Sequence, residues 1–143
     1  MAIIYMCPTG THSSLVAANL HIGKIDLTSS VSDILHLPYY GQVNNKPGFF
    51  LFIGKDNQER AVYTLGVYHE AEIIKRSALD LLKLFNKERD FFFVDVSKFM
   101  PKVSVRCNAF LKKEMYPREK IAVTLKENLK EIYYEVKKYN NYI

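Results

Sequence analysis

The residues best suited to chemistry lie near the start of the chain, in the run Cys-Pro-Thr-Gly-Thr-His-Ser-Ser at positions 7–14. This run separates a short apolar segment from one with helical spacing, so we expect a turn that joins a strand to a helix. The first amides of a helix are unpaired and carry about half a positive charge, which favours an anion. Gly10 lets the backbone approach a ligand closely. Four hydroxyl groups are also available, on Thr9, Thr11, Ser13 and Ser14.

We therefore predict that this turn binds a small anionic ligand, such as a phosphate, sulfate or carboxylate group. The alternative is that Ser13 or Thr11 merely caps the helix and that the turn holds only water. No lysine follows the glycine as in a Walker A loop, and the pattern G-x-G-x-x-G is absent. Nucleotide binding therefore has no direct support.

Cys7 and His12 are the candidate catalytic residues of the turn. A thiol near a helix start can have a lowered pKa and act as a nucleophile, although a buried and unreactive Cys7 is the alternative. His12 could bind an anion as a cation, act as a general acid or base, or simply face solvent. The protein is then either a binding or regulatory module, or a phosphoryl-transfer enzyme or hydrolase that uses one of these two residues.

Two further residues are expected near the turn because ligands of open α/β sheets bind beyond the carboxyl ends of parallel strands. His69 follows one predicted strand and Asp95 ends another, so we predict that both join the ligand site. Asp95 could equally cap the segment that follows it. Cys7, His12 and His69 lack the local spacing of zinc ligands, so no metal ion and no cofactor are expected.

The elements that must position these residues alternate along the chain. Strands are predicted at 3–6, 49–53, 61–66, 91–94 and 121–123. Helices are predicted at 15–22, 30–37, 73–85, from Pro101 to about 111, and after Thr124, which forms a capping box with Glu127. The phenylalanines at 49, 50, 52 and 91–93 are expected in the core.

Strands that alternate with helices predict an α/β domain, Rossmann-like and three-layered, with a mostly parallel sheet of about five strands. The polar link at 55–59 is too short for a crossover helix, so the strands on either side should pair as an antiparallel hairpin. The chain has 143 residues, which fits a single domain over 1–143.

The overall composition is that of a globular protein, with 48% hydrophobic and 24% charged residues. No leader peptide and no membrane-spanning stretch are recognisable, so we expect a cytoplasmic protein without a membrane partner. Cys7 and Cys107 are too few for a disulfide framework, and both should be reduced. The sequence does not specify an oligomeric state.

The net charge of +5 arises largely in the second half of the chain, where lysines and arginines are frequent from Lys98 to Lys138. This half also carries interleaved acids at Glu114, Glu119, Glu127, Glu131 and Glu135. Because a nucleic-acid backbone requires clustered cations, we favour solvent-facing lysines on two late helices. Nucleic-acid association through these helices is the second alternative function, after the enzyme.

The turn can be compared with two cysteine-based phosphate loops, and it resembles the second of them. The low-molecular-weight tyrosine phosphatases place an arginine six residues after their cysteine, where this chain has Ser13, so Arg106 or Arg118 would have to supply the cation. The run Cys7-Pro8-Thr9-Gly10 with His12 resembles the phosphocysteine loop of fructose-type phosphotransferase-system IIB domains, in which C-P-T-G precedes His-Thr and an alanine-rich helix. This resemblance implies a phosphorylated cysteine.

A broader resemblance spans most of the chain. The opening strand, the T-H-S-S turn at 11–14, the helix that runs through His21-Ile22-Gly23, and the segments Leu37-Pro38-Tyr39 and Phe52-Ile53-Gly54 look like those of an uncharacterised family of spore-forming Gram-positive bacteria. That family is a domain of unknown function, so the resemblance implies a shared fold and no activity. Its turn is glycine-rich, whereas Pro8 and Thr9 stand in that stretch here.

Overall fold

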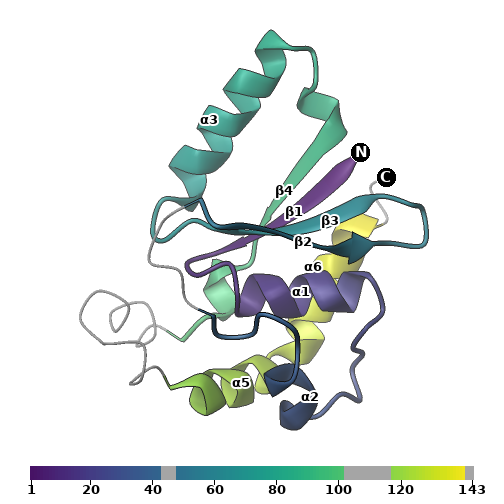
Figure 1. Ribbon diagram of the computed structural model, residues 1–143, viewed down its shortest axis with the longest axis vertical. Coiled ribbons are helices and arrows are strands. Elements are labelled where there is room, and N and C mark those ends of the chain that lie inside the picture. Colours follow the sequence, from purple (N-terminus) through teal and green to yellow (C-terminus); the bar gives the residue numbers. More distant parts are fainter. Residues whose placement is uncertain (43–47, 102–116, 141–143) are drawn as a thin grey trace.

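A computed structural model describes residues 1–42, 48–101 and 117–140 of the chain. Four strands form one open sheet in the order β2-β3-β1-β4 (Figure 1). They are β1 (Ala2–Cys7), β2 (Phe50–Lys55), β3 (Ala61–Gly66) and β4 (Phe91–Asp95). β1 is the central strand and pairs in parallel with β3 and β4, while β2 and β3 form the predicted antiparallel hairpin. The mixed α/β class and the mostly parallel sheet are therefore confirmed.

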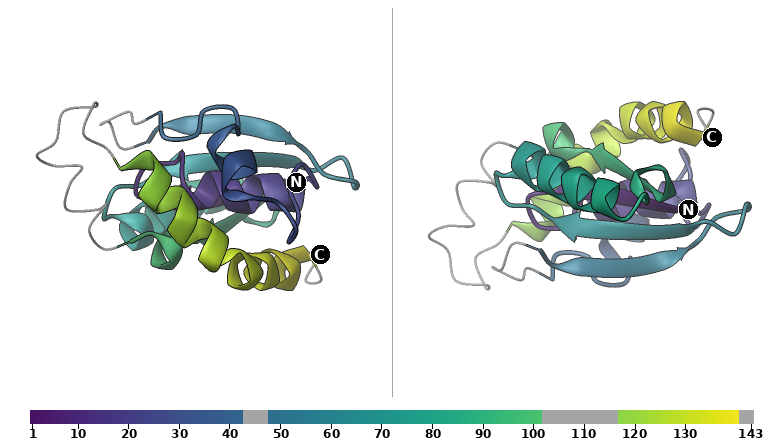
Figure 2. Two further views of the ribbon diagram at one scale, coloured as in Figure 1. Left: turned by 90° about the horizontal axis from the view of Figure 1, so that it is seen from below. Right: turned by 90° about the horizontal axis from the view of Figure 1, so that it is seen from above.

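Helices lie on both faces of this sheet (Figures 1 and 2). α1 (Ser13–His21), α5 (Arg118–Glu127) and α6 (Leu129–Asn140) cover one face, and the short α2 (Val31–Leu35) packs beside α5. α3 (Ala71–Leu84) lies on the opposite face. Single turns of 3₁₀ helix, η1 (Glu88–Asp90) and η2 (Ser97–Phe99), flank β4.

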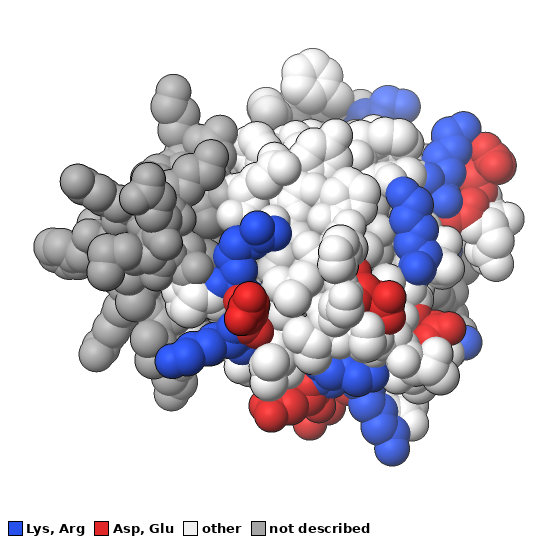
Figure 3. Space-filling model, turned by 60° about the horizontal axis from the view of Figure 1, so that its bottom comes forward, with Lys and Arg blue, Asp and Glu red and all other residues white. Residues whose placement is uncertain are grey.

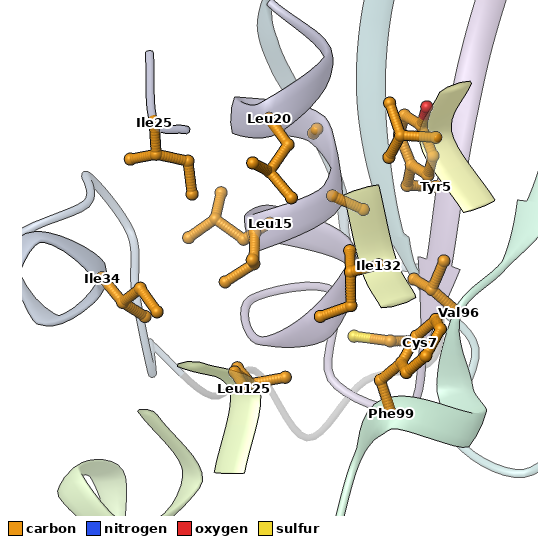
Figure 4. Close-up of a cluster of buried hydrophobic side chains, with 14 of the residues drawn as sticks. Tyr5, Cys7, Leu15, Leu20, Ile25, Ile34, Val96, Phe99, Leu125 and Ile132 are labelled. Atoms are coloured by element: carbon orange, nitrogen blue, oxygen red, sulfur yellow. The ribbon is translucent and has the colours of Figure 1, made fainter. Parts of the chain in front are cut away.

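The two faces of the sheet bury very different amounts of apolar surface. Alternate residues of β1 point to opposite faces, so Ile3, Tyr5 and Cys7 enter the large core under α1, α5 and α6. Figure 4 shows part of this core, with Cys7 on the same side of the sheet as Val96 and Phe99. The face under α3 holds a small cluster of four buried residues, Ile4, Met6, Leu65 and Val67.

α1 is the best-protected helix, because all of its residues are buried. The side chains of α1 itself are mostly apolar or small on every side of the helix, which is typical of a helix packed between other layers. Here the sheet lies on one side of α1 and α6 on the other (Figure 1). The turn before α1 lies at the carboxyl end of β1, and its residues are buried as well.

Local signals in the sequence account for several helix ends. Ser30 and Asp33 form a reciprocal capping box at the start of α2. Gly23, with φ of 73°, follows α1, and Asn86, with φ of 53°, follows α3. The predicted helix from Pro101 to about 111 lies outside the described residues.

The predicted strand at 121–123 is wrong, since these residues lie within α5. Ile121, Ala122 and Leu125 are buried on one face of that helix. Taken alone, the run Ile-Ala-Val, which contains two β-branched residues, resembles a short strand. The capping box at Thr124 is also wrong, because Thr124 lies inside the helix and its hydroxyl donates to the carbonyl of Lys120. The described residues accordingly form four strands instead of five.

The expected burial of the strand phenylalanines is also wrong in part. Phe50 and Phe52 are 48% and 55% exposed. Both are placed on the α3 side of the sheet by their pairing with Leu65 and Tyr63 of β3. α3 lies toward β4 and leaves this part of the face uncovered (Figure 2).

Candidate functional site

The turn between β1 and α1 is organised around the sulfur of Cys7. Cys7 Sγ lies 3.0 Å from Ser14 Oγ, 3.2 Å from the amide nitrogen of Gly10 and 3.6 Å from Thr9 Oγ1. These donors come from the loop and from the first turn of α1, so they approach the sulfur from different directions. The turn therefore converges its hydrogen-bond donors on one atom.

This arrangement lowers the pKa of the Cys7 thiol. Burial alone raises the pKa, because it disfavours the charged thiolate. The hydroxyl and amide of Ser14, the hydroxyl of Thr9 and the amide of His12 all stabilise the thiolate, and together they outweigh burial. The pKa of Cys7 consequently lies below its ordinary value. Cys7 is also a free cysteine and is fully buried.

Gly10 permits the close approach of the turn to the end of β3. Its φ is +75°, a conformation that side-chain-bearing residues rarely adopt. A Cβ atom at this position would lie 2.7 Å from the amide nitrogen of Gly66. At Gly66, a Cβ atom would in turn lie 3.0 Å from the carbonyl oxygen of Thr9. Two glycines on separate segments are thus needed for this packing, and only Gly10 was singled out from the sequence.

His12 is neutral and lies inside the protein. Its side chain is fully buried, and burial together with the charge of Arg118 lowers its pKa to about 3. Its Nδ1 atom lies 2.7 Å from Thr9 Oγ1, and its ring meets the Tyr40 ring edge-on at 5.2 Å. A solvent-facing His12 is therefore wrong, and a cationic role at neutral pH is not compatible with this pKa.

Thr9 links His12 to Cys7. When Cys7 is a thiolate, the Thr9 hydroxyl donates to the sulfur, and the neutral His12 donates its Nδ1 proton to Thr9 Oγ1. The backbone amide of Thr11 also donates to Thr9 Oγ1, at 3.3 Å. The hydroxyl of Thr9 is thereby held in the orientation that stabilises the thiolate.

Arg118 reaches this region from the start of α5. Its Nη2 donates to the carbonyl of Tyr40 at 3.0 Å, and its guanidinium lies 5.7 Å from the centre of the Tyr40 ring. Gly41 donates its amide to the carbonyl of Thr11, and a Cβ atom there would lie 2.8 Å from Arg118 Nε. The segment 40–41 therefore joins Arg118 to the turn. Arg106, the other cation considered, lies outside the described residues.

Two hydroxyls of the turn have no hydrogen-bond partner among the described residues. Thr11 and Ser13 are fully buried, and neither Thr11 Oγ1 nor Ser13 Oγ makes such a bond. A buried unsatisfied polar group is costly, so native proteins rarely retain one without a reason. Ser13 is also the first residue of α1, where the amide dipoles of the helix begin.

The other predicted ligand residues lie apart from the sulfur. The backbone of Val67 and Tyr68 bonds to Cys7 and Pro8, so β3 does end beside the turn. The side chain of His69 is nevertheless exposed and contacts Tyr68. Asp95 pairs with Met6, whose side chain faces α3, and its carboxylate accepts the amide of Ser97. Asp95 thus caps the following turn on the face opposite Cys7.

The described residues form neither a metal site nor a membrane-spanning helix. Within 1–42, 48–101 and 117–140, no three His, Cys, Asp or Glu side chains come close enough to hold a metal ion. No helix in these ranges has the length and apolarity to cross a membrane. Figure 3, which turns the underside of the molecule forward, shows basic side chains beside acidic ones instead of one basic block.

Together, these features define an open, mostly parallel α/β domain with a cysteine at the end of its central strand and a hydroxyl-rich turn before its first helix. The family model described as Protein of unknown function (DUF3189) matches residues 2–141, and the chain belongs to this family. Comparisons with curated proteins and with solved structures returned no match. The expected membership of a domain family of unknown function is confirmed, while the bacterial group and the likeness to phosphotransferase IIB domains stay predictions.

Proposed function

We propose that the turn at 7–14 binds a small phosphate-like oxyanion next to the thiolate of Cys7. The observation that carries this proposal is a pair of buried hydroxyls, Thr11 Oγ1 and Ser13 Oγ, which have no hydrogen-bond partner among the described residues and lie in the turn whose other donors converge on Cys7 Sγ. Fixed donors aimed at one point in a dry interior stabilise negative charge far more than the same donors do in water. The turn is therefore suited to hold an anion.

The groups that would hold the oxyanion are those the thiolate leaves unused. Thr11 Oγ1 and Ser13 Oγ are buried hydroxyls without hydrogen-bond partners in the described part of the chain. The start of α1 adds its dipole. Arg118, held against segment 40–41, supplies the positive charge that the turn itself lacks at Ser13. Because the turn is buried, the ligand enters only when the segments that cover it move.

A second function, cysteine-dependent phosphoryl transfer, is favoured by the lowered pKa of Cys7. The thiolate would attack the phosphorus atom, so that an S–P bond forms and the bond from phosphorus to the leaving oxygen breaks. The leaving group then takes a proton from water, and a water molecule or an acceptor hydroxyl attacks the phosphorus, so that the S–P bond breaks and the Cys7 thiolate is regenerated. His12 is neutral in this scheme and holds the Thr9 hydroxyl in place.

The proposal is tested by titrating Cys7 in a Cys107→Ser background, where the thiolate absorbance reports a single residue. We expect a pKa below about 8.5, the value of an ordinary thiol. Ser14→Ala should raise this pKa, because the closest donor is lost. Ser77→Ala, which removes an exposed hydroxyl of α3, should leave it unchanged.

Ligand binding is measured in the same protein as the rate of alkylation of Cys7 with and without inorganic phosphate. We expect phosphate to slow alkylation at saturable concentration and Arg118→Gln to weaken this protection. An ordinary pKa together with no protection by phosphate would overturn the proposal. Hydrolysis of p-nitrophenyl phosphate that is lost in Cys7→Ser would establish the enzyme over the binding module.

A further inference from the structure

The face of the molecule that carries α3 exposes an unusual amount of apolar side chain. Ile73, Leu81 and Leu84 of α3 are 62%, 57% and 78% exposed, and Phe85 directly after it is 66% exposed. Phe50 and Phe52 of β2 lie on the same side of the sheet. We propose that this apolar face, formed by these six residues, binds a second copy of the chain.

The helix contributes one half of the apolar face. α3 has a strongly amphipathic sequence, yet none of its residues is fully buried. Ala71 and Ile74, in its first turn, pack against the small cluster under the helix. Leu81 and Phe85 follow Ile74 on the same stripe about two and three turns later and remain exposed, because α3 rises away from the sheet along its length (Figure 1).

The sheet contributes the other half. Phe50 stacks on Tyr63 with ring centres 4.7 Å apart, and Phe52 lies 5.3 Å from the same ring. These aromatic rings cover the outer face of β2 and β3. No helix of the described chain lies over them, since α3 lies toward β4 (Figure 2). The uncovered face of β2 and β3 thus lies on the same side of the sheet as α3, whose second half has no surface beneath it.

The exposed area is large enough for a specific interface. If a fully exposed large side chain presents about 200 Å², the six residues together offer roughly 700 Å². A standard protein–protein interface buries about 800 Å² on each partner. Isolated exposed apolar residues are ordinary, but this much exposed apolar surface on one side of the sheet usually marks an interaction site.

The charges on this face favour a second copy over an anionic surface. Arg76 pairs with Glu72, Lys83 with Asp80 and Lys87 with Asp90. These pairs leave few free cations that could attract lipid headgroups or a nucleic acid. They also allow two chains that each carry a charge of +5 to approach by this face without strong repulsion.

A two-fold symmetric dimer would cover both the exposed half of α3 and the exposed aromatic rings of the sheet. If the exposed second half of α3 of each copy packs over the aromatic rings of β2 and β3 of the other, each patch covers its own counterpart. Such self-complementarity is what an isologous dimer interface requires. An unrelated protein would have to reproduce the same combination of helix and sheet.

The test is the molar mass of the purified full chain, measured by sedimentation equilibrium from micromolar to millimolar concentration. We expect a reversible dimer, twice the 16.6 kDa of the chain. Leu81→Lys and, separately, Phe52→Lys should each weaken dimerisation at least tenfold, because each places a charge inside the interface. Val123→Lys is the matched control: it places the same charge on an apolar residue of α5, 44% exposed, and should leave the dimer intact.

Circular dichroism confirms that each variant is folded, as expected for substitutions at exposed positions. A wild-type chain that remains monomeric at millimolar concentration would overturn the proposal, and so would a dimer unaffected by both substitutions on the apolar face. Equal weakening by Val123→Lys would place the interface elsewhere and would also overturn it. A wild-type monomer that binds vesicles of anionic lipid through α3 would show that the occupant is a membrane.

Discussion

Gly10 determines how closely the turn at 7–14 can approach the end of β3. A left-handed conformation costs an ordinary residue about 1 kcal/mol or more, and here the space for a side chain is also filled. The two costs can be separated in this chain. Gly23 has nearly the same φ, 73°, but no atom lies within 4 Å of its missing Cβ.

Gly23→Ala should therefore destabilise the protein by about 1 kcal/mol, the cost of the left-handed backbone alone. Gly10→Ala adds the overlap with the backbone of Gly66, and overpacking typically costs about 1–3 kcal/mol more. We expect a total of about 2–4 kcal/mol, measured by urea denaturation. Equal losses of unfolding free energy for the two variants would show that the turn relaxes freely. This would contradict the close packing of the turn at 7–14 against the end of β3.

A buried polar network joins α1 to the β2–β3 hairpin. His21 Nε2 donates to Asp56 Oδ2 at 3.0 Å, and the same oxygen accepts Arg60 Nε at 2.6 Å. Burial lowers the pKa of His21, so its ring is neutral and its Nδ1 accepts the hydroxyl of Tyr5 at 2.8 Å. The network thus holds the end of α1, the hairpin and the central strand in one arrangement.

Asp56→Asn should destabilise the protein by about 3–5 kcal/mol, because it removes the buried carboxylate that accepts hydrogen bonds from both His21 and Arg60. Glu59→Gln is the matched control in the same hairpin. It breaks the exposed pair with Lys55 and should cost under about 1 kcal/mol. Thermal unfolding at pH 7 separates the two. Similar losses of stability in Asp56→Asn and Glu59→Gln would mean that the buried network does not stabilise the fold.

The same carboxylate predicts a response to acid. Burial raises the pKa of Asp56, but its bonds from His21 and Arg60 bring it to about 2, below the value of about 3.9 in an unfolded chain. Asp56 therefore contributes stability above about pH 4, and that contribution falls as the pH drops towards 2. Asp56→Asn should lose this part of the acid dependence.

Local patterns in the sequence predicted helices and strands well where the pattern was compatible with only one kind of secondary structure. The strand at 61–66 and the antiparallel hairpin follow from residue type and a short polar link. The run 121–123 is ambiguous, because three apolar residues suit either a strand or a buried helix turn. Its continuation through Leu125 and Leu129, both buried, is what identifies the helical stripe.

Features that depend on packing between distant segments could not be predicted in the same way. The position of Cys7 at the end of a strand was evident, but its contact with Ser14 depends on how the loop folds back. The sequence also gave no sign that segment 40–41 would lie against the turn and carry Arg118 to it. The exposure of Phe52 likewise depends on where α3 lies on the sheet.

Taken as a whole, the molecule consists of a thick and a thin half on either side of one sheet. The thick half contains α1, α5 and α6 with most of the buried residues, and the thin half contains α3 over a cluster of four buried side chains. Regions with few buried apolar contacts open locally at lower free energy than the core. α3 connects β3 to β4, so it can detach without breaking the pairing of β1 with its neighbours.

Native-state hydrogen exchange should therefore reveal two levels of protection. In dilute solution, the amides of α3 should exchange through local opening, at a free energy several kcal/mol below that of α1 and α6. Since the proposed dimer covers the second half of α3, protection of that helix should rise with protein concentration in the wild type and not in Leu81→Lys. The α1 amides serve as the internal control, because α1 lies in the large core on the far side of the sheet. Equal protection of α3 and α1 in dilute solution would show that the thin half is as cooperative as the thick one.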